Sequence, residues 1–387
     1  MENVDFQHRT RIVSGPGQLE SVGQHAAALG ARRVMVVCDP GIRQAGYAER
    51  TVDSLHAQKL ETEVFDDFGE NPTASMVDAG TDRAAEFRPD LLIGIGGGSS
   101  MDCCKGINFV YSCGGSIADY RGVGNATSDM LPMIAVPTTA GTGSEMQSFA
   151  IISDDETHLK MPCGDPKAAP RIAILDPTLT LSQPHRVAML TAIDAISHAV
   201  ETYVTRRRNR VSTTYSGRAF ELLASGFERL LESPDDLEVR SDMQWGAAMA
   251  GMAIEASMLG AAHATANPLT AHHDVPHGQA VGLMLPAVVR MNGGEHPQWY
   301  GELGRRLPRS MHDDPVENIA QTIESWVRSA GLVNHIEDLK QDRIEPAAQM
   351  DAWVDDAMKQ WTGTFNPVTL TPDNVRGLYR SVCRTIA

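Results

Sequence analysis

The sequence lacks the cysteine pattern of a disulfide-rich or zinc-ribbon protein. Its six cysteines are scattered, none forms a C-x-x-C pair, and Cys103 and Cys104 are neighbours, which is awkward for a structural disulfide. Reduced thiols are therefore expected, and they favour a cytoplasmic protein. The opening residues, MENVDFQHRT, lack the apolar core of a secretory signal. No uninterrupted apolar run approaches the ~20 residues that a membrane-spanning helix needs.

Basic charge is also scarce. Lys and Arg number 33 against 49 Asp and Glu, which gives a net charge of -16 at pH 7. Surfaces for nucleic acid or anionic membranes need clustered Lys and Arg, so neither partner is expected. With 42% hydrophobic and 21% charged residues the composition is that of a globular protein. A chain of 387 residues is too long for one ordinary core, and two domains are expected.

The first half of the chain alternates short apolar runs with helix-like stretches such as 73–87. The predicted strands are 32–41, 60–68, 90–100, 131–139 and 171–177. Strands rich in Val and Ile that alternate with helices favour a parallel sheet covered on both faces. The sequence therefore predicts a dinucleotide-type α/β domain over residues 1–182.

The pattern changes to helical periodicity after about residue 182. The segments that carry it are 185–204, 216–233, 241–269 and 315–332. We expect 241–269 to form one long helix rich in Ala and Met, with His263 near its end. Thr371 and Pro372 are typical of an N-cap and the first helical position, and predict a last helix to about Ile386. An all-helical domain is predicted over 183–387.

A glycine-rich turn follows the predicted third strand. In LLIGIGGGSSMDCCKG, Gly96, Gly97 and Gly98 precede a helix that is expected to start near Ser99. Ser99 and Asp102 have the spacing of a capping box. Backbone amides at such a turn, together with the positive end of a helix dipole, suit a pyrophosphate. The pattern departs from the usual dinucleotide fingerprint because Ser99 stands at the third glycine, and a turn that only bends the chain is the alternative.

Two further segments favour a nucleotide site. Asp39 ends the first predicted strand in VVCDPG, where a carboxylate can bind ribose hydroxyls and repel a 2′-phosphate, which favours NAD over NADP. A turn-forming Asp-Pro is the alternative interpretation. The segment PTTAGTGSE (137–145) carries Thr138, Thr139, Thr142 and Ser144 around two glycines. Such hydroxyls and exposed amides can form a polar rim, although they are frequent in any loop.

The helical half contains a candidate metal site. Asp194 and His198 in AIDAISHAVE are four residues apart and would share one helix face. A hydrogen-bonded core pair is the alternative. Four of the chain's 13 histidines, at positions 263, 272, 273 and 277, lie in the apolar stretch 260–286. A set of Asp194, His198, His263 and His277 would suit Fe²⁺ or Zn²⁺.

The sequence resembles the iron-containing (group III) alcohol dehydrogenase family over nearly its whole length. The motifs that carry the resemblance are GGGSSMDCCKG, PTTAGTGSE, AIDAISHAVETYV and HATANPLTAHHDVPHGQAVGLMLPAVVRMN. The resemblance implies a Rossmann-like domain, a helical domain and an active cleft between them. It assigns the metal, most readily Fe²⁺, to Asp194, His198, His263 and His277. It places the nucleotide near Asp39, Asn71, Gly96, Gly97, Gly98, Ser99, Asp102, Thr138, Thr139, Thr142, Lys160 and Leu179.

One position departs from the family pattern. Many relatives have a histidine four residues after the third ligand, where this chain has Asn267. His272 and His273 stand where relatives usually carry an apolar residue and an aromatic. We hypothesise that one of them, His273 before His272, serves as the proton relay or lines the substrate pocket. A surface or supporting histidine is the alternative.

The resemblance implies reversible hydride transfer between a small alcohol or aldehyde and NAD(H), with the metal polarising the substrate oxygen. A glycerol-dehydrogenase-like zinc enzyme is the nearest variant. A lyase like dehydroquinate synthase needs basic residues for a substrate phosphate, and 255–286 contains no Lys or Arg. A non-catalytic metal- or nucleotide-binding protein is a further alternative. The apolar helical half favours a homo-oligomer.

Overall fold

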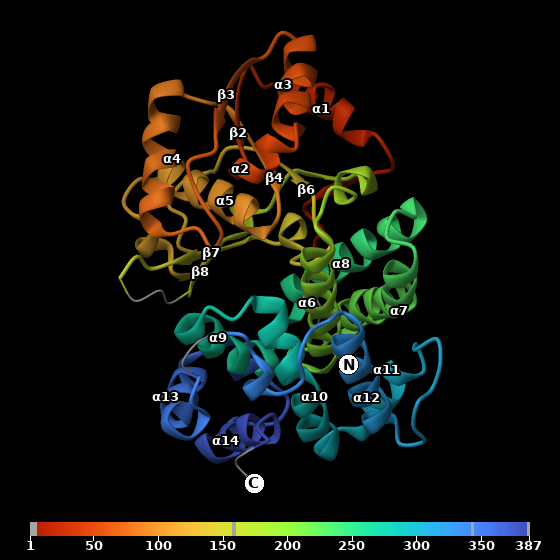
Figure 1. The fold of residues 1–387 in the computed structure, drawn as a ribbon. Helices are drawn as coiled ribbons and strands as arrows, with labels where there is room; N and C mark the ends of the chain where they lie inside the picture. Colours follow the sequence, from red (N-terminus) through yellow and green to blue (C-terminus); the bar gives the residue numbers. More distant parts are fainter. Residues whose placement is uncertain (1–5, 157–159, 342–343, 385–387) are drawn as a thin grey trace. The chain divides into compact units, whose positions relative to one another are not determined.

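The computed structural model describes residues 6–156, 160–341 and 344–384. The chain divides into two compact units, and the division falls between Gln183 and Pro184. The first unit contains a parallel sheet and the second consists of helices (Figure 1). Each unit is described separately below.

The first unit is built on a six-stranded, fully parallel sheet. In spatial order its strands are β1 (Arg11–Ser14), β9 (Ile172–Leu175), β6 (Met133–Pro137), β4 (Leu91–Gly96), β2 (Arg33–Val37) and β3 (Glu61–Phe65). The five predicted strands are confirmed, and each lies within its predicted run. Strand β1 was missed because four half-exposed residues carry too little pattern. The predicted α/β class is confirmed.

Helices cover both faces of this sheet. One face packs against η1 (Gln18–Ser21), α1 (Val22–Ala28) and α3 (Tyr47–Ala57), and the other against α4 (Ala74–Phe87) and α5 (Gly98–Cys113). Strand β2 shows how this works, because Val34 and Val36 belong to the first core and Met35 and Val37 to the second. Both faces of the strand are buried, which explains why its sequence is continuously apolar.

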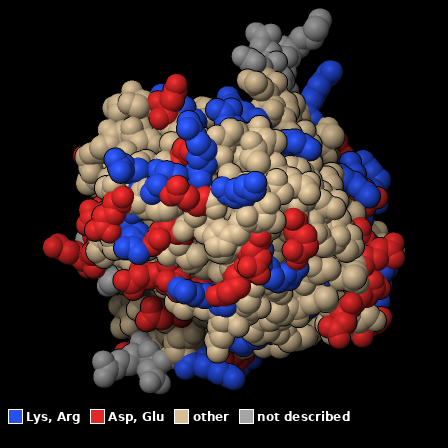
Figure 2. Space-filling view, turned by 90° about the horizontal axis from the view of Figure 1, so that it is seen from above, with Lys and Arg blue, Asp and Glu red and all other residues tan. Residues whose placement is uncertain are grey.

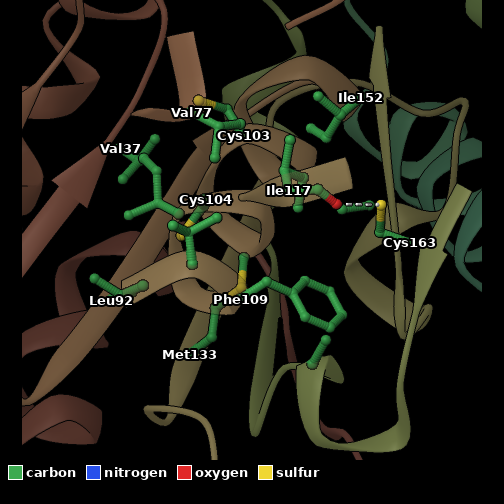
Figure 3. Packing of buried hydrophobic residues seen from close by; sticks show 14 of the residues in the cluster. Val37, Val77, Leu92, Cys103, Cys104, Phe109, Ile117, Met133, Ile152 and Cys163 are labelled. Atoms are coloured by element: carbon green, nitrogen blue, oxygen red, sulfur yellow. Dashed lines mark hydrogen bonds between the residues drawn. The ribbon is translucent and has the colours of Figure 1, made fainter. Parts of the chain in front are cut away.

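The second of these cores contains most of the buried cysteines. Figure 3 shows Cys103 and Cys104 packed among aliphatic side chains, and the Cys163 thiol donating a hydrogen bond to the carbonyl of Ile117. Burial raises the pKa of the Cys163 thiol to about 12. Burial also raises the pKa values of Cys103 and Cys104. The reactive form of cysteine is the thiolate, and the raised pKa values keep these three thiols protonated. They therefore serve as core residues.

A small second sheet completes the first unit. It contains β5 (Gly122–Val123), β8 (Lys160–Gly164) and β7 (Phe149–Ser153), with β7 and β8 antiparallel. The sequence pattern did not predict it. The remaining short elements are α2 (Pro40–Gln44), η2 (Ile117–Tyr120), η3 (Ser144–Met146), η4 (Pro166–Ala168) and η5 (Pro177–Thr180).

Charges of both signs lie interspersed on the face shown in Figure 2. Some ion pairs bridge neighbouring elements of the first unit, such as Arg43 with Asp66 at 2.7 Å and Arg50 with Glu20 at 2.8 Å. Exposed pairs of this kind contribute little stability individually, about 0–1 kcal/mol. Their effect here is to offset the local charge.

The second unit is helical throughout its described residues. Its longer helices are α6 (His185–Val204), α7 (Arg210–Glu232), α8 (Leu237–Ser257), α9 (Ala261–His273), α10 (His277–Glu295), α11 (Pro297–Gly304), α12 (Pro315–Ser329), α13 (Pro346–Lys359) and α14 (Pro372–Ser381), with short turns η6 (Ile336–Asp338) and η7 (Trp361–Phe365). Side chains of Asn209, Asp236, Asp314 and Thr371 cap four of them. Across the described ranges, no helix combines the length and apolarity that crossing a bilayer requires.

The prediction of one helix over 241–269 is wrong. Helix α8 ends at Ser257 and α9 begins at Ala261, because Met258 adopts a φ of 80°. Gly260 permits the tight connection, since a Cβ there would lie 3.0 Å from oxygens of both Glu201 and Asn366. His263 therefore lies in the first turn of α9, not near the end of a long helix.

The last helix is shorter than predicted. Thr371 caps it and Pro372 occupies its first turn, as expected, but α14 ends at Ser381. Ile386, the predicted end, lies outside the described residues.

Candidate metal centre and nucleotide site

The four predicted metal ligands converge inside the helical unit. Helix α6 contributes Asp194 and His198, α9 contributes His263, and α10 contributes His277. The Oδ1 atom of Asp194 lies 3.4 Å from Nε2 of His198, 3.5 Å from Nε2 of His263 and 3.7 Å from Nε2 of His277. The Nε2 atoms of His198 and His263 are 3.1 Å apart. Ligand atoms of Asp194, His263 and His277 all lie within 4.8 Å of one another, and His198 adjoins this group through its contacts with Asp194 and His263.

The centre is closed on one side and open on the other. The side chains of Asp194, His198 and His263 are 5–7% exposed, whereas that of His277 is 27% exposed. His277 is the first residue of α10, directly after Pro276, so it lies at the rim of the helical packing. A ligand could therefore approach a bound ion from the His277 side.

Glu201 supports the centre and was missed by sequence reasoning. Its Oε2 accepts a 2.5 Å hydrogen bond from Nδ1 of His263, and its Oε1 accepts a 2.6 Å bond from the backbone amide of Ala262. With Nδ1 donating, Nε2 of His263 carries the lone pair that a metal requires. Glu201 follows His198 by three residues on α6, so helical spacing from this predicted ligand is the signal that could have identified it.

The charges of these groups are strongly coupled. Burial raises the pKa of Asp194, but His198, His263 and His277 outweigh it and hold that pKa well below its usual range. Burial lowers the pKa of His263, but the charge of Glu201, the nearby carboxylate of Asp194 and the hydrogen bond to Glu201 raise it to about 9. The centre therefore favours an ionised carboxylate and positive charge beside it.

The geometry fits a divalent cation. The buried Oδ1 of Asp194 accepts no hydrogen bond from the described residues. Its contacts with the imidazole nitrogens, at 3.4–3.7 Å, are longer than an ordinary N–H···O bond. A cation among these four atoms would satisfy all of them. One carboxylate and three imidazoles suit Fe²⁺ or Zn²⁺.

In the first unit, the glycine turn lies against the hydroxyl-bearing loop. Gly96 ends β4 with a φ of 143°, and a Cβ there would lie 2.3 Å from Oγ of Ser100. The amide of Thr138 donates a 2.9 Å bond to the carbonyl of Gly96. A Cβ on Gly98 would lie 2.7 Å from Cγ2 of Thr142. The turn therefore requires glycine, and the two segments together form what we call the cradle, residues 96–99 and 138–144.

The predicted capping box is absent. Helix α5 begins at Gly98 after Gly97, and no side chain caps it. Ser99 Oγ instead accepts a bond from the amide of Asn71, which adopts a φ of 51°. Asp102 accepts bonds from Oγ of Ser144 at 2.6 Å and from the amide of Ile151 at 3.2 Å. Ser99 and Asp102 therefore bond residues distant in the sequence instead of forming the local box, and no side chain caps the first amides of α5.

Asp39 forms the predicted Asp-Pro turn and also lies beside the glycine turn, as a nucleotide-binding carboxylate would. Its Oδ1 accepts a 3.2 Å bond from the amide of Ile42 and so caps α2, and its Oδ2 accepts a 3.1 Å bond from Ser100. The side chain is half-buried beside Gly96, since a Cβ on Gly96 would lie 3.3 Å from Oδ2. The Asp-Pro turn therefore positions the carboxylate at the cradle.

The remaining predicted nucleotide residues differ in exposure. Thr139 and Thr142 are half-buried, and Thr138 is buried. Lys160 begins β8 and lowers the pKa of Asp102 through its charge, although burial raises that pKa overall. Leu179 is fully buried in the core on the α1 and α3 face of the sheet, so its side chain does not border the cradle.

Three residues differ from the family pattern, and each of them contacts α13 or the residue that follows it: Asn267, His272 and His273. Nδ2 of Asn267 donates to Oε1 of Gln360 at 2.9 Å. His272 pairs with Asp356 through a 2.6 Å contact. Nε2 of His273 accepts a 3.0 Å bond from the indole of Trp353. Desolvation, followed by the charge of His272, lowers the pKa of His273, which favours the neutral ring.

Two family models match the chain. Residues 9–177 match iron-containing alcohol dehydrogenase, and residues 188–383 match the C-terminal part of the same family. The chain belongs to the iron-containing alcohol dehydrogenase family. It is 31% identical to alcohol dehydrogenase 4 of Schizosaccharomyces pombe over 95% of this chain and 86% of that protein. It is 30% identical to choline dehydrogenase of Bacillus subtilis over 97% and 94%.

Solved structures of this alcohol dehydrogenase family agree with the fold. A 1,3-propanediol oxidoreductase superposes with a TM-score of 0.94 at 27% identity, covering 98% of this chain and all of that chain. A sulfoacetaldehyde reductase from Bifidobacterium kashiwanohense, solved with NAD⁺, gives 0.87 at 27% identity over the whole of both chains. The chain is therefore an alcohol dehydrogenase of the iron-containing family. These matches favour the dehydrogenase over the lyase, zinc polyol and non-catalytic alternatives.

Proposed function

We propose that this alcohol dehydrogenase interconverts a small primary alcohol and its aldehyde, with the ion held by Asp194, His198, His263 and His277. The observation that carries the proposal is the convergence of these four side chains around the unbonded Oδ1 of Asp194. Fe²⁺ is the first choice and Zn²⁺ the alternative, since the ligand set suits both. When bound, the ion supplies Lewis acidity that polarises the substrate oxygen.

The protein's own residues prepare the centre for this chemistry. Glu201 keeps the Nε2 lone pair of His263 directed at the ion position. Asp194 and His198 are buried, so water is kept away from the ion position on their side. His277 is more exposed, and substrate would bind the ion from the side of His277. A site poor in water strengthens the electrostatic stabilisation of the developing alkoxide.

The nucleotide is proposed to bind at the cradle in the first unit. The uncapped amides at the start of α5 and the close approach of the glycines support a pyrophosphate there. Asn71, Ser99, Thr138, Thr139 and Thr142 would line it, with Asp102 and Lys160 behind. Asp39 supports NAD over NADP, because a carboxylate beside the ribose repels a 2′-phosphate. Leu179 would affect the adenine end of the nucleotide site only indirectly, by packing in the core beneath it.

The substrate class is proposed from the relatives and from the chemistry. The relatives are named for small alcohols and aldehydes, among them 1,3-propanediol in Klebsiella pneumoniae and lactaldehyde in Escherichia coli. Hydride transfer requires the substrate carbon to lie against the nicotinamide. We therefore propose a small primary alcohol or aldehyde, whose oxygen can bind the ion while its reacting carbon lies against the nicotinamide.

His273 is the proposed proton relay. His272 is committed to Asp356, whereas the Trp353 bond leaves His273 neutral with its proton on Nδ1. A neutral imidazole near physiological pH can pass a proton between the centre and water. We also propose a homo-oligomer, and a cytoplasmic location supported by six free cysteines.

The test combines metal analysis with a coenzyme-linked assay. The purified protein is analysed for Fe and Zn, then assayed for NADH formation with a panel of small alcohols before and after chelation and after repletion with either ion. His198→Ala is expected to lose metal and activity, whereas His185→Ala, on the exposed start of the same helix, keeps both. Full activity in metal-free protein would overturn the proposal.

A further inference from the structure

Lys105 is a charged residue inside the core of the first unit. It lies in the second turn of α5 and is 0% exposed. Its Nζ donates to the carbonyl of Ser144 at 2.7 Å, to Oγ of Ser144 at 2.7 Å and to the carbonyl of Phe149 at 2.8 Å. A buried ammonium is costly unless its donors are paired, and all three are.

These bonds connect the two sides of the cradle. Lys105 belongs to the helix that starts at the glycine turn, whereas Ser144 ends the hydroxyl-bearing loop. The amide of Ser144 donates to Oγ1 of Thr142 at 3.3 Å, and Thr142 is the residue whose Cγ2 would lie 2.7 Å from a Cβ on Gly98. Lys105 thus fixes the loop that packs on the turn.

Asp102 closes the network from the same helix. Its Oδ1 accepts from Oγ of Ser144 at 2.6 Å and lies 3.9 Å from Nζ of Lys105. Its Oδ2 accepts from the amide of Ile151 in β7. Since Asp102 is only 14% exposed, it balances the charge of Lys105 within the protein. The Ser144 hydroxyl accepts from one charged group and donates to the other, so its orientation is fixed.

We propose that Lys105, with Ser144 and Asp102, is the positioning device of the pyrophosphate site: it sets the separation of residues 96–99 and 138–144. The proposal rests on the proposed nucleotide site. Lysine suits this role because one ammonium provides the three donors needed to join α5 to two carbonyls and a hydroxyl. Lys105 does not touch the dinucleotide itself, because its donors are used inside the protein.

The test compares ligands that share only part of NAD. Binding of NAD, ADP-ribose and adenosine is measured by calorimetry in wild type, Lys105→Met and Ser144→Ala. ADP-ribose contains the pyrophosphate and adenosine does not. Lys105→Met is expected to raise Kd for NAD and ADP-ribose about tenfold, roughly the loss of one good hydrogen bond, with little change for adenosine. The KM for NAD rises while kcat at saturating NAD stays within about twofold.

Controls separate positioning from general destabilisation. Lys167→Met removes another lysine of the same unit, whose ammonium donates to the carbonyl of Ala126, and should leave all three Kd values unchanged. Equal weakening of all three ligands would overturn the proposal, as would unchanged NAD binding in folded Lys105→Met. Should Lys105→Met not fold, Ser144→Ala decides, since it removes the hydroxyl link alone. Absence of NAD binding in wild type would instead refute the proposed function.

Discussion

Glu201 and His263 share a 2.5 Å hydrogen bond in the interior of the helical unit, and both side chains are at most 5% exposed. Through it a carboxylate fixes the ring orientation and proton position of the third proposed ligand. The first prediction concerns Glu201→Gln, which keeps the size of the side chain and removes its charge. It should weaken metal binding about 10–100-fold, as measured by competition with a chelator, because the ring becomes a weaker donor.

The matched control for that variant is Glu232→Gln, on the exposed end of α7. Its metal affinity should equal that of wild type. If Glu201→Gln bound the ion as tightly as the control, Glu201 would be no more than a cap for α9.

The second prediction concerns the close contact between Gly98 and Thr142. In Gly98→Ala the new methyl would lie 2.7 Å from Cγ2 of Thr142 and must push the loop away. The Kd for NAD should rise about tenfold or more, while metal content stays unchanged. Gly294→Ala is the control, because a Cβ there meets nothing within 4 Å. It should leave NAD binding as it is and raise stability by up to ~1 kcal/mol.

The third prediction concerns the proposed relay. His273→Phe removes the imidazole but keeps a ring beside Trp353, and should lower kcat about 10–100-fold. It should also flatten the pH dependence below about pH 6.5, because the pKa of His273 is lowered from 6.5. His272→Phe removes the pair with Asp356 and should alter stability more than the pH profile. An unchanged pH–rate profile and activity in His273→Phe would leave that residue a supporting role only.

The fourth prediction concerns acid stability of the helical unit. Arg290 on α10 donates to both carboxylate oxygens of Glu317 on α12, at 2.9 and 2.7 Å. This hydrogen bonding outweighs burial and lowers the pKa of Glu317 from 4.5 to about 2. Because the folded pKa is lower than the unfolded one, the stabilisation is complete above about pH 4.5 and is lost as the pH falls towards 2.

The measurement is urea unfolding of wild type and Glu317→Gln between pH 7 and pH 3. The variant should be less stable by up to about 1 kcal/mol at pH 7, a small figure because the pair is partly exposed. The difference should shrink steadily below pH 4.5. Glu70→Gln, at an exposed position, should show no such trend. A gap as large at pH 3 as at pH 7 would contradict the assignment.

The sequence predicted best those features that local pattern determines. Buried parallel strands such as β2 and β4 are continuously apolar, and helix α6 carries a long apolar run, so both were located correctly. The pair Asp194 and His198 follows from helical spacing, but spacing alone could not distinguish a core pair from two ligands. His263 and His277 were proposed with them from the cluster of histidines in the apolar stretch 260–286, and the resemblance to a family implies the same four ligands.

The sequence failed where distant residues decide the local structure. The break between α8 and α9 depends on Gly260 fitting against Glu201 and Asn366, which lie far away along the chain. Asp102 and Ser99 have the spacing of a capping box, yet Ser144 and Asn71 bind them instead. The strands of the small sheet are short and half-polar, and no periodicity marks them.

The start of α9 has a consequence for how the centre acquires its ion. A single carboxylate, Glu201, binds both the Ala262 amide and the His263 ring, while Asn366 binds the Ala261 amide. Folding of that helical turn therefore aims the imidazole before any ion arrives. Little reorganisation remains when the ion enters, so loading should be fast and the apoprotein should retain the backbone of the loaded form.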